Sequence, residues 1–109
     1  MKDDFDKQAV KVFKALGDPN RYSILRLLVE KGELSCADFD DKTGLSKPAM
    51  SHHYRVLENA GLIDVRKKGL HYYMKANMTV LEQFVPNFIK THLKKRSHII
   101  GTQRTEQGT

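Results

Sequence analysis

The chain has 109 residues, of which 39% are hydrophobic and 29% charged, with a net charge of +6. This length predicts one globular, soluble domain, because there is too little chain for two hydrophobic cores. No apolar run approaches the ~20 residues that span a membrane, and the acidic N-terminus lacks the apolar stretch of a secretory signal. The single cysteine excludes a disulfide framework within the chain and fits a cytoplasmic protein.

The positive charge is concentrated in the second part of the sequence. Residues 1–46 hold eight Lys or Arg and nine Asp or Glu, a balance of −1, whereas residues 47–109 hold eleven and four, a balance of +7. Such an asymmetry is typical of a nucleic-acid-binding protein, and an ordinary basic surface is the alternative. We therefore expect a nucleic acid to contact the second part of the chain.

Two helices are predicted at the start of the chain. Asp3 or Asp4 can cap a first helix, which has its apolar residues on one face and ends near Leu16. Asp18 caps a second helix, with proline in its first turn, and Gly32 ends that helix. Two arginines of the second helix are expected to be solvated: Arg21 and Arg26.

A third helix is predicted to begin after Ser35, because Asp38, three residues later, completes a capping-box pattern. Several carboxylates lie in and before this helix, and such a cluster could hold a hard cation. Their spacing matches no known cation-binding loop, so a surface turned away from phosphates is the favoured interpretation. These acidic residues are Glu30, Glu33, Asp38, Asp40 and Asp41.

A fourth helix, residues 46–60, has the clearest boundaries. Ser46 is a good N-cap, Pro48 lies in the first turn, and Gly61 follows the end. Its opposite faces differ, since one is polar and basic and the other is apolar at helical spacing. The apolar stripe consists of Met50, Tyr54 and Leu57. With the third helix it forms a helix-turn-helix pattern, in which it would be the recognition helix that enters the DNA major groove.

Two β-like runs follow, around the basic turn Lys68-Gly69, and predict a two-stranded hairpin. Its tip can reach phosphate or the minor groove, and a solvated turn is the alternative. The predicted DNA-binding residues of the recognition helix and of this tip are Ser46, Lys47, Ala49, Ser51, His52, His53, Arg55, Arg66, Lys67 and Lys68.

A last helix is predicted from Asn77 or Thr79 to near Arg96, with a kink or a late start because Pro86 lies inside it. Its wide apolar stripe predicts a subunit interface. This stripe includes Leu81, Phe84, Val85, Phe88, Ile89 and His92. The domain is therefore expected to cover residues 1–96, and residues 97–109, which lack periodicity, to form a flexible tail.

Short motifs in a fixed order carry a family resemblance. They are Ala15 to Arg21, Ser51-His52-His53, Val56-Leu57 with Ala60 to Leu62, and Lys68-Gly69 with Tyr72-Tyr73. Over roughly residues 9–76 the chain resembles the ArsR-type winged helix-turn-helix repressors, and it looks most similar to members without a classical metal site. The resemblance implies a mainly α fold with a small β-hairpin: about five helices plus a two-stranded wing, in a dimer.

The resemblance also implies roles for single residues. The first helix, with Phe5 and Val12, is expected to pack into the dimer interface. Tyr73 is expected to be mainly structural. His53 is expected to pack or to touch a phosphate rather than a base.

The metal-binding patterns of similar repressors are not matched. Ser35 and Ala37 stand where thiolate sensors have cysteines, with Cys36 between them, and the zinc pattern of the last helix is reduced to His92. We therefore predict no metal and no cofactor, while an unidentified effector stays possible. Two alternative roles stay open for Cys36 and two for His92. Cys36 is a buried thiol or a redox switch, and His92 is an interface histidine or, across a dimer, a proton or metal sensor.

The sequence thus predicts a transcriptional regulator that binds double-stranded DNA, in the form of a dimeric repressor on an inverted repeat. The rival hypothesis is a winged helix whose basic face binds an acidic partner protein. RNA binding fits the charge, but aromatic residues are not spaced for base stacking. An enzyme is the weakest hypothesis, because the sequence shows no paired carboxylates, oriented Cys–His pair or glycine-rich phosphate loop.

Overall fold

The computed structural model describes residues 3–94, apart from the side chains at positions 41, 42 and 94. The predicted tail, residues 97–109, lies outside the described residues. Within the described range the elements are α1 (Asp4–Leu16), α2 (Pro19–Lys31), β1 (Leu34–Ser35), α3 (Cys36–Thr43), α4 (Lys47–Asn59), β2 (Ile63–Lys68), β3 (His71–Ala76), α5 (Met78–Phe84) and the π-helical segment η1 (Ile89–Lys94). The predicted mainly α fold, with a helix-turn-helix followed by a hairpin, is confirmed.

Short polar side chains begin the first four helices as predicted. Asp3, Asp18 and Ser46 accept hydrogen bonds from backbone N–H groups in the first turns of α1, α2 and α4. At the start of α3, Ser35 accepts from the N–H of Asp38 at 3.2 Å, and the Asp38 carboxylate accepts from the N–H of Ser35 at 2.9 Å. The predicted starts of these four helices are confirmed.

The sheet has three strands, whereas the sequence predicted two. β2 and β3 form the predicted antiparallel hairpin, with Ile63 opposite Ala76. β1 pairs antiparallel with β3, with Leu34 opposite Met74, so the strand order is β1-β3-β2. A strand of two residues is too short to show the alternation that identifies a strand in a sequence.

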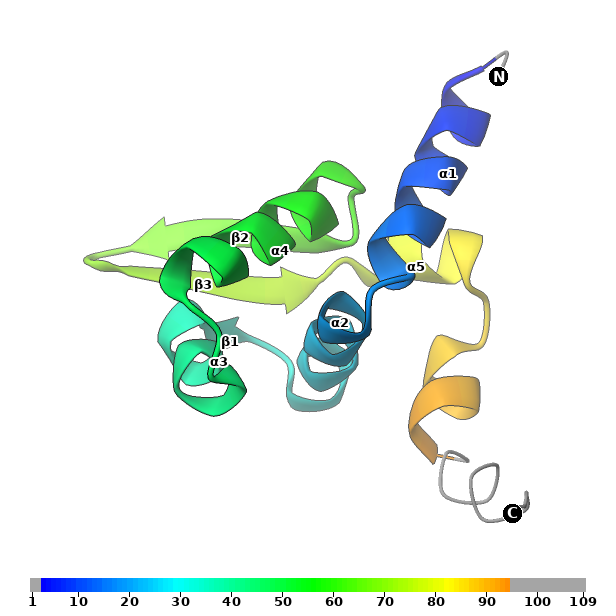
Figure 1. Ribbon diagram of the computed structural model, residues 1–109. Coiled ribbons are helices and arrows are strands. Elements are labelled where there is room, and N and C mark those ends of the chain that lie inside the picture. Colours follow the sequence, from blue (N-terminus) through cyan, green and yellow to red (C-terminus); the bar gives the residue numbers. More distant parts are fainter. Residues whose placement is uncertain (1–2, 95–109) are drawn as a thin grey trace.

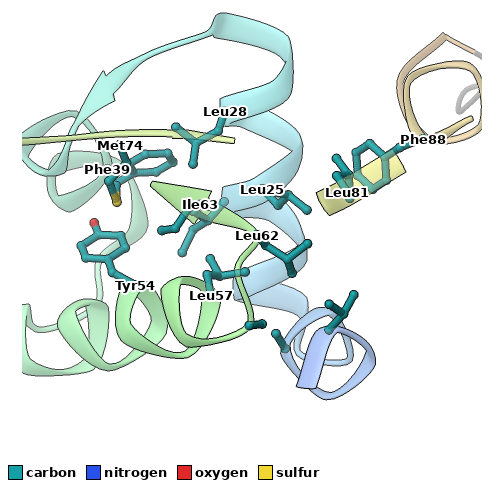
Figure 2. Close-up of a cluster of buried hydrophobic side chains, with 14 of the residues drawn as sticks. Leu25, Leu28, Phe39, Tyr54, Leu57, Leu62, Ile63, Met74, Leu81 and Phe88 are labelled. Atoms are coloured by element: carbon teal, nitrogen blue, oxygen red, sulfur yellow. The ribbon is translucent and has the colours of Figure 1, made fainter. Parts of the chain in front are cut away.

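The hydrophobic core lies between the sheet and the helices. Leu25 of α2, Leu57 of α4 and Met74 of β3 are fully buried. Figure 2 shows Ile63 on one side of α2 and Phe88 on the other, so α2 packs against both the sheet and the C-terminal elements. In Figure 1 the hairpin and α4 lie at one end of the molecule, and α1, α5 and both termini of the described chain lie toward the other.

The last predicted helix is interrupted. α5 ends at Phe84 and η1 begins at Ile89, with Pro86 between them. Proline has no N–H and clashes with the preceding turn. The Glu82 carboxylate accepts hydrogen bonds from the N–H groups of Asn87, at 3.0 Å, and of Phe88, at 3.3 Å. The sequence indicated a kink or a late start at Pro86, and the observed interruption is larger.

Four residues of the predicted dimer interface are buried within this single chain. Val12 and Leu81 are 0% exposed, Phe88 is 1% exposed and Phe84 is 9% exposed. Their side chains belong to the core of one chain, so they leave almost no apolar area for a second copy. The large apolar side chains that stay exposed near them are Phe5, Val10, Phe13 and Ile89.

Substitution of Gly61 should cost stability in two ways. Gly61 has φ of 83°, and a Cβ there would lie 2.8 Å from Nε2 of Gln8, which donates to the carbonyl of Ala60 at 3.2 Å. Gly44→Ala is the matched control, because Gly44 has φ of 72° and open space around its Cα. We expect Gly61→Ala to lower the free energy of unfolding in urea by about 2 kcal/mol and Gly44→Ala by about 1 kcal/mol. Equal losses would show that the hydrogen bond of Gln8 contributes nothing.

Candidate nucleic-acid interface

α4 buries one face and presents the other to solvent. Met50, Tyr54 and Leu57 are buried, as the sequence predicted. The predicted DNA-binding residues on the exposed face are Ser46, Lys47, Ser51, His52 and Arg55, while Ala49 and His53 are half-buried. A row of donors and acceptors beside a permanent guanidinium is suited to the base edges of a major groove.

A hydrogen bond from α4 to α3 fixes the helix-turn-helix. The hydroxyl of Tyr54 donates to Oδ1 of Asp40 at 3.2 Å. Burial, followed by the neighbouring Asp40 carboxylate, raises the pKa of Tyr54, so the hydroxyl keeps its proton and stays a donor. Between the two helices, Gly44 has φ of 72°, which allows the tight turn. This contact orients α4 by its buried face and leaves the exposed face free.

The hairpin carries the second group of predicted residues, and one of them is already paired. Arg66 donates through Nε to Oε2 of Glu33 at 2.9 Å and through Nη2 to Oε1 at 3.1 Å. Glu33 lies 33 residues before Arg66 and meets it because Glu33 directly precedes β1, which pairs with the hairpin. The hydrogen bond from Arg66 is the main cause that lowers the pKa of Glu33. Arg66 therefore ties the hairpin to the segment before β1, while Lys67 and Lys68 have no carboxylate within 4.0 Å among the described residues.

An apolar side chain stands at the turn of the hairpin. Leu70 is 91% exposed, and Tyr72, two residues later, is 50% exposed with its ring 5.8 Å from Nζ of Lys67. A groove of about 490 Å³ lies between the hairpin and the recognition helix, and its lining includes Lys47, Arg55 and Tyr72. Leu70 was not among the predicted DNA-binding residues, although its place directly after Gly69 in a hairpin turn was a usable signal.

The two arginines of α2 are bound rather than solvated. Nη1 of Arg21 lies 3.2 Å from Nδ1 of His53 in α4. Nε of Arg21 donates to the carbonyl of Ala15 in α1. Arg26 donates through Nε to the carbonyl of His92 at 3.1 Å. The expectation that both side chains are solvated was therefore wrong. Their partners are 32 and 66 residues away, and periodicity does not indicate such long-range contacts.

The two candidate effector residues lie in different elements, Cys36 at the start of α3 and His92 in η1. His92 stacks on Phe88 at 4.6 Å between ring centroids, and its Nδ1 lies 2.8 Å from the hydroxyl of Tyr22. Burial, followed by the charge of Arg26, lowers the pKa of His92. Cys36 is half-buried at the start of α3, where burial and then the Asp40 carboxylate raise the pKa of its thiol. Among the side chains that the structure describes, no three His, Cys, Asp or Glu form a group that could hold a metal ion.

A helix-turn-helix followed by a basic hairpin defines the winged helix-turn-helix class of DNA-binding proteins. The chain belongs to the ArsR-type family of this class and is a DNA-binding transcriptional regulator. The family model described as a helix-turn-helix domain matches residues 16–66. No described helix has the length and apolar composition to cross a bilayer.

Three curated relatives support this assignment. The chain is 34% identical over 92 residues to the uncharacterized HTH-type transcriptional regulator YceK of Bacillus subtilis, covering 84% of this chain and 92% of that protein. It is 39% identical over 74 residues to the transcriptional repressor SdpR of the same organism, with 68% and 81% covered. It is 32% identical over 81 residues to an arsenical resistance operon repressor of Staphylococcus aureus, with 74% and 77% covered.

Solved structures share the fold. HlyU from Vibrio cholerae superimposes with a TM-score of 0.64 at 27% identity, covering 77% of this chain and 90% of that one. An ArsR-like transcriptional regulator from Rhodococcus superimposes with a TM-score of 0.66 at 23% identity, covering 79% and 80%. The second likeness concerns the fold alone.

The Arg66–Glu33 pair predicts an effect of an acidic residue on DNA affinity. Glu33→Gln removes the partner charge of Arg66, so we expect affinity for any duplex to rise about threefold at low salt and the gain to shrink as salt increases. Glu30→Gln is the matched control, because it removes the same charge from an exposed residue outside this ion pair. Fluorescence anisotropy over a salt series measures both. Identical curves for the two variants would mean that Arg66 contributes nothing once it is released.

The raised pKa of Cys36 predicts slow thiol chemistry. A higher pKa leaves less thiolate near neutral pH, and thiolate is the reactive form. We expect iodoacetamide to alkylate Cys36 in the folded protein at least about tenfold more slowly than in the same protein unfolded in urea. Mass spectrometry of timed samples measures the two rates. A faster reaction in the folded state would instead support a redox role for this thiol.

Proposed function

We propose that the protein is a dimeric repressor that inserts α4 of each protomer into successive major grooves of an inverted-repeat operator. The main support for this proposal is the exposed polar and cationic face of α4, which lies beside a basic hairpin (Figure 1). The helix and the hairpin reach the same end of the molecule, so one DNA duplex can contact both. A relative of similar length, SdpR, is named a transcriptional repressor, which supports the direction of the regulation.

The recognition helix would divide its contacts between bases and phosphates. Arg55 is exposed in the middle of α4 and can donate two hydrogen bonds to one guanine. Lys47, Ser51 and His52 are exposed on the same helix and supply further donors toward base edges or nearby phosphates. Ser46 is the N-cap of α4 and Ala49 lies in its first turn, where the positive end of the helix favours a phosphate. The N–H of Ala49 already donates to the Ser46 hydroxyl at 3.2 Å.

The hairpin would hold the flanks of the operator. Lys67 and Lys68 are exposed and have no carboxylate within 4.0 Å among the described residues, so they are available to phosphates. Arg66 is expected to contribute less, because Glu33 already neutralises it. Leu70 at the turn would contact the minor groove, where apolar side chains commonly insert.

A second copy of the chain would cover the apolar residues at the opposite end. Phe5 and Phe13 of α1 are 53% and 58% exposed, and Ile89 of η1 is 39% exposed. Clustered large apolar groups that stay in contact with water are typical of a subunit interface, and Phe5 and Phe13 lie on the same helix. Dimerisation through α1 would leave both recognition helices exposed, as a twofold operator requires.

The first experiment is fluorescence anisotropy on DNA from upstream of the protein's own gene, against a random duplex, over a salt series. We expect a preference of about 1000-fold or more with a steep salt dependence. Weak and equal binding would be followed by selection from a random DNA pool. If no motif emerged, the proposal would be wrong, and the rival hypothesis of a basic face that binds an acidic partner protein would replace it.

Arg55 and the hairpin lysines should differ in what they contribute. We expect Arg55→Ala to weaken operator binding about tenfold or more, with a much smaller loss on random DNA, because a bidentate base contact is lost. Lys67→Ala should weaken both duplexes equally and reduce the salt slope by about 0.9, because a phosphate contact is lost. Equal losses on both duplexes for Arg55→Ala would count against a base contact.

A further inference from the structure

A single arginine joins α1 and α2 to the recognition helix. From the first turn of α2, Nε of Arg21 donates to the carbonyl of Ala15 at 2.8 Å, and Nη2 donates to the carbonyl of Lys14 at 3.4 Å. Its Nη1 lies 3.2 Å from Nδ1 of His53 in α4. The rigid guanidinium thus satisfies carbonyls at the C-terminal end of α1 and contacts the recognition helix with the same group.

The contact with Arg21 decides which nitrogen of His53 carries the proton. An arginine N–H can only donate, so Nδ1 must accept, and the neutral ring then carries its hydrogen on Nε2. The nearest carboxylate oxygen, Oδ2 of Asp18, lies 4.0 Å from Nδ1, beyond hydrogen-bonding distance. That oxygen already accepts from the N–H groups of Asn20 and Arg21. Nδ1 is therefore held as an acceptor.

The other ring nitrogen is left for an acceptor outside the chain. Among the groups that the structure describes, none accepts a hydrogen bond from Nε2 of His53, and the His53 side chain as a whole is 12% exposed. A donor that is so nearly buried needs a partner. His53 lies on α4 between the exposed His52 and the buried Tyr54, at the edge of the polar face. Against that edge, DNA can supply a backbone phosphate oxygen as the acceptor.

We propose that Arg21 is a positioning residue for DNA binding. It holds the neutral ring of His53 in the Nε2–H tautomer, so that the ring donates to a DNA backbone phosphate, and it fixes α4 relative to α1. Arg21 acts through His53 and makes no contact with DNA itself. The inference rests on the proposed role of α4 in DNA binding, so its test includes a measurement that needs no DNA.

The tautomer can be measured on the free protein. In a long-range ¹H–¹⁵N NMR spectrum at a pH where the ring is neutral, we expect Nδ1 of His53 at the shift of an unprotonated nitrogen and Nε2 at that of a protonated one. Loss of these peaks in His53→Gln assigns them, and Arg21→Met should move them toward the average of two tautomers. An Nδ1–H tautomer in the unmodified protein would overturn the proposal. This result is independent of any DNA sequence.

Two substitutions of His53 separate its two nitrogens. Asn places its amide near the position of Nδ1, and Gln places its amide near the position of Nε2. We expect His53→Asn to lose about tenfold in affinity, equally on operator and random duplex, and His53→Gln to stay within about threefold. Equal affinities of the two variants would assign His53 to packing alone and overturn the phosphate contact.

The role of Arg21 is tested against the other arginine of its helix. Arg21→Met and Arg26→Met remove the same charge from α2, but Arg26 donates to the carbonyl of His92, away from α4. We expect about a tenfold loss of DNA affinity for Arg21→Met and less than about a twofold loss for Arg26→Met. The double variant Arg21→Met/His53→Asn should lose no more than His53→Asn, because the two residues act as one unit. Additive losses would overturn the proposal.

The outcomes distinguish this proposal from the proposed function. If the unmodified protein selects no DNA sequence, the proposed function fails, while the tautomer measurement still reports whether Arg21 orients His53. If Arg21→Met does not fold, the tautomer in the unmodified protein and the two His53 variants decide the matter. Folding of every variant is checked by circular dichroism before DNA is added.

Discussion

The burial of Met50 and Leu57 fixes the direction in which the polar face of α4 points. Each side chain is at most 1% exposed, and burying one such side chain contributes about 1.5–3 kcal/mol. Rotation of α4 by one residue would remove these groups from the core and place charged ones such as Arg55 in it, which costs several kcal/mol per unpaired charge. The core therefore determines which residues meet a ligand, although it contains none of them.

Apolar packing has little directional preference, so the position of α4 along its axis needs polar contacts. Three hydrogen-bonded contacts, each with a different helix, fix this position. Tyr54 donates to Asp40 of α3, Gln8 of α1 donates to the carbonyl of Ala60, and Arg21 of α2 contacts His53. Each such bond contributes about 1 kcal/mol net, which is small beside the core. Their effect is on geometry, because each is satisfied at one position of the helix.

The structure could be predicted from the sequence wherever a local rule decides it. Asp18 and Ser46 begin helices because a short side-chain oxygen can accept from the first turn, and this pattern is complete within four residues. The stripe on α4 was also predictable, since its spacing reflects the helical period. These local rules predict the recognition helix and the hairpin correctly without any information on the contacts between them.

Contacts between distant residues were not predictable in the same way. Glu33 and Arg66 are 33 residues apart, and they meet only because β1 pairs with β3, so the sequence left the arginine without a partner. Val12 and Phe13 show the same limit for apolar residues. They are adjacent in α1, yet Val12 is 0% exposed and Phe13 is 58% exposed. Hydrophobicity identifies both as residues that avoid water, but only the packing shows which one this chain covers itself.

The two faces of α1 connect the opposite ends of the molecule. One face exposes Phe13, and another directs Gln8 to the end of α4, while the last carbonyls of the helix accept from Arg21. α1 has only 13 residues, and it is tied to the rest of the chain at Gln8 and at its C-terminal carbonyls. A second copy of the chain packed on Phe13 would therefore define the position of α4 through direct contacts, with no flexible linker between them. The spacing of two recognition helices on DNA would follow from the same contacts that hold a single chain together.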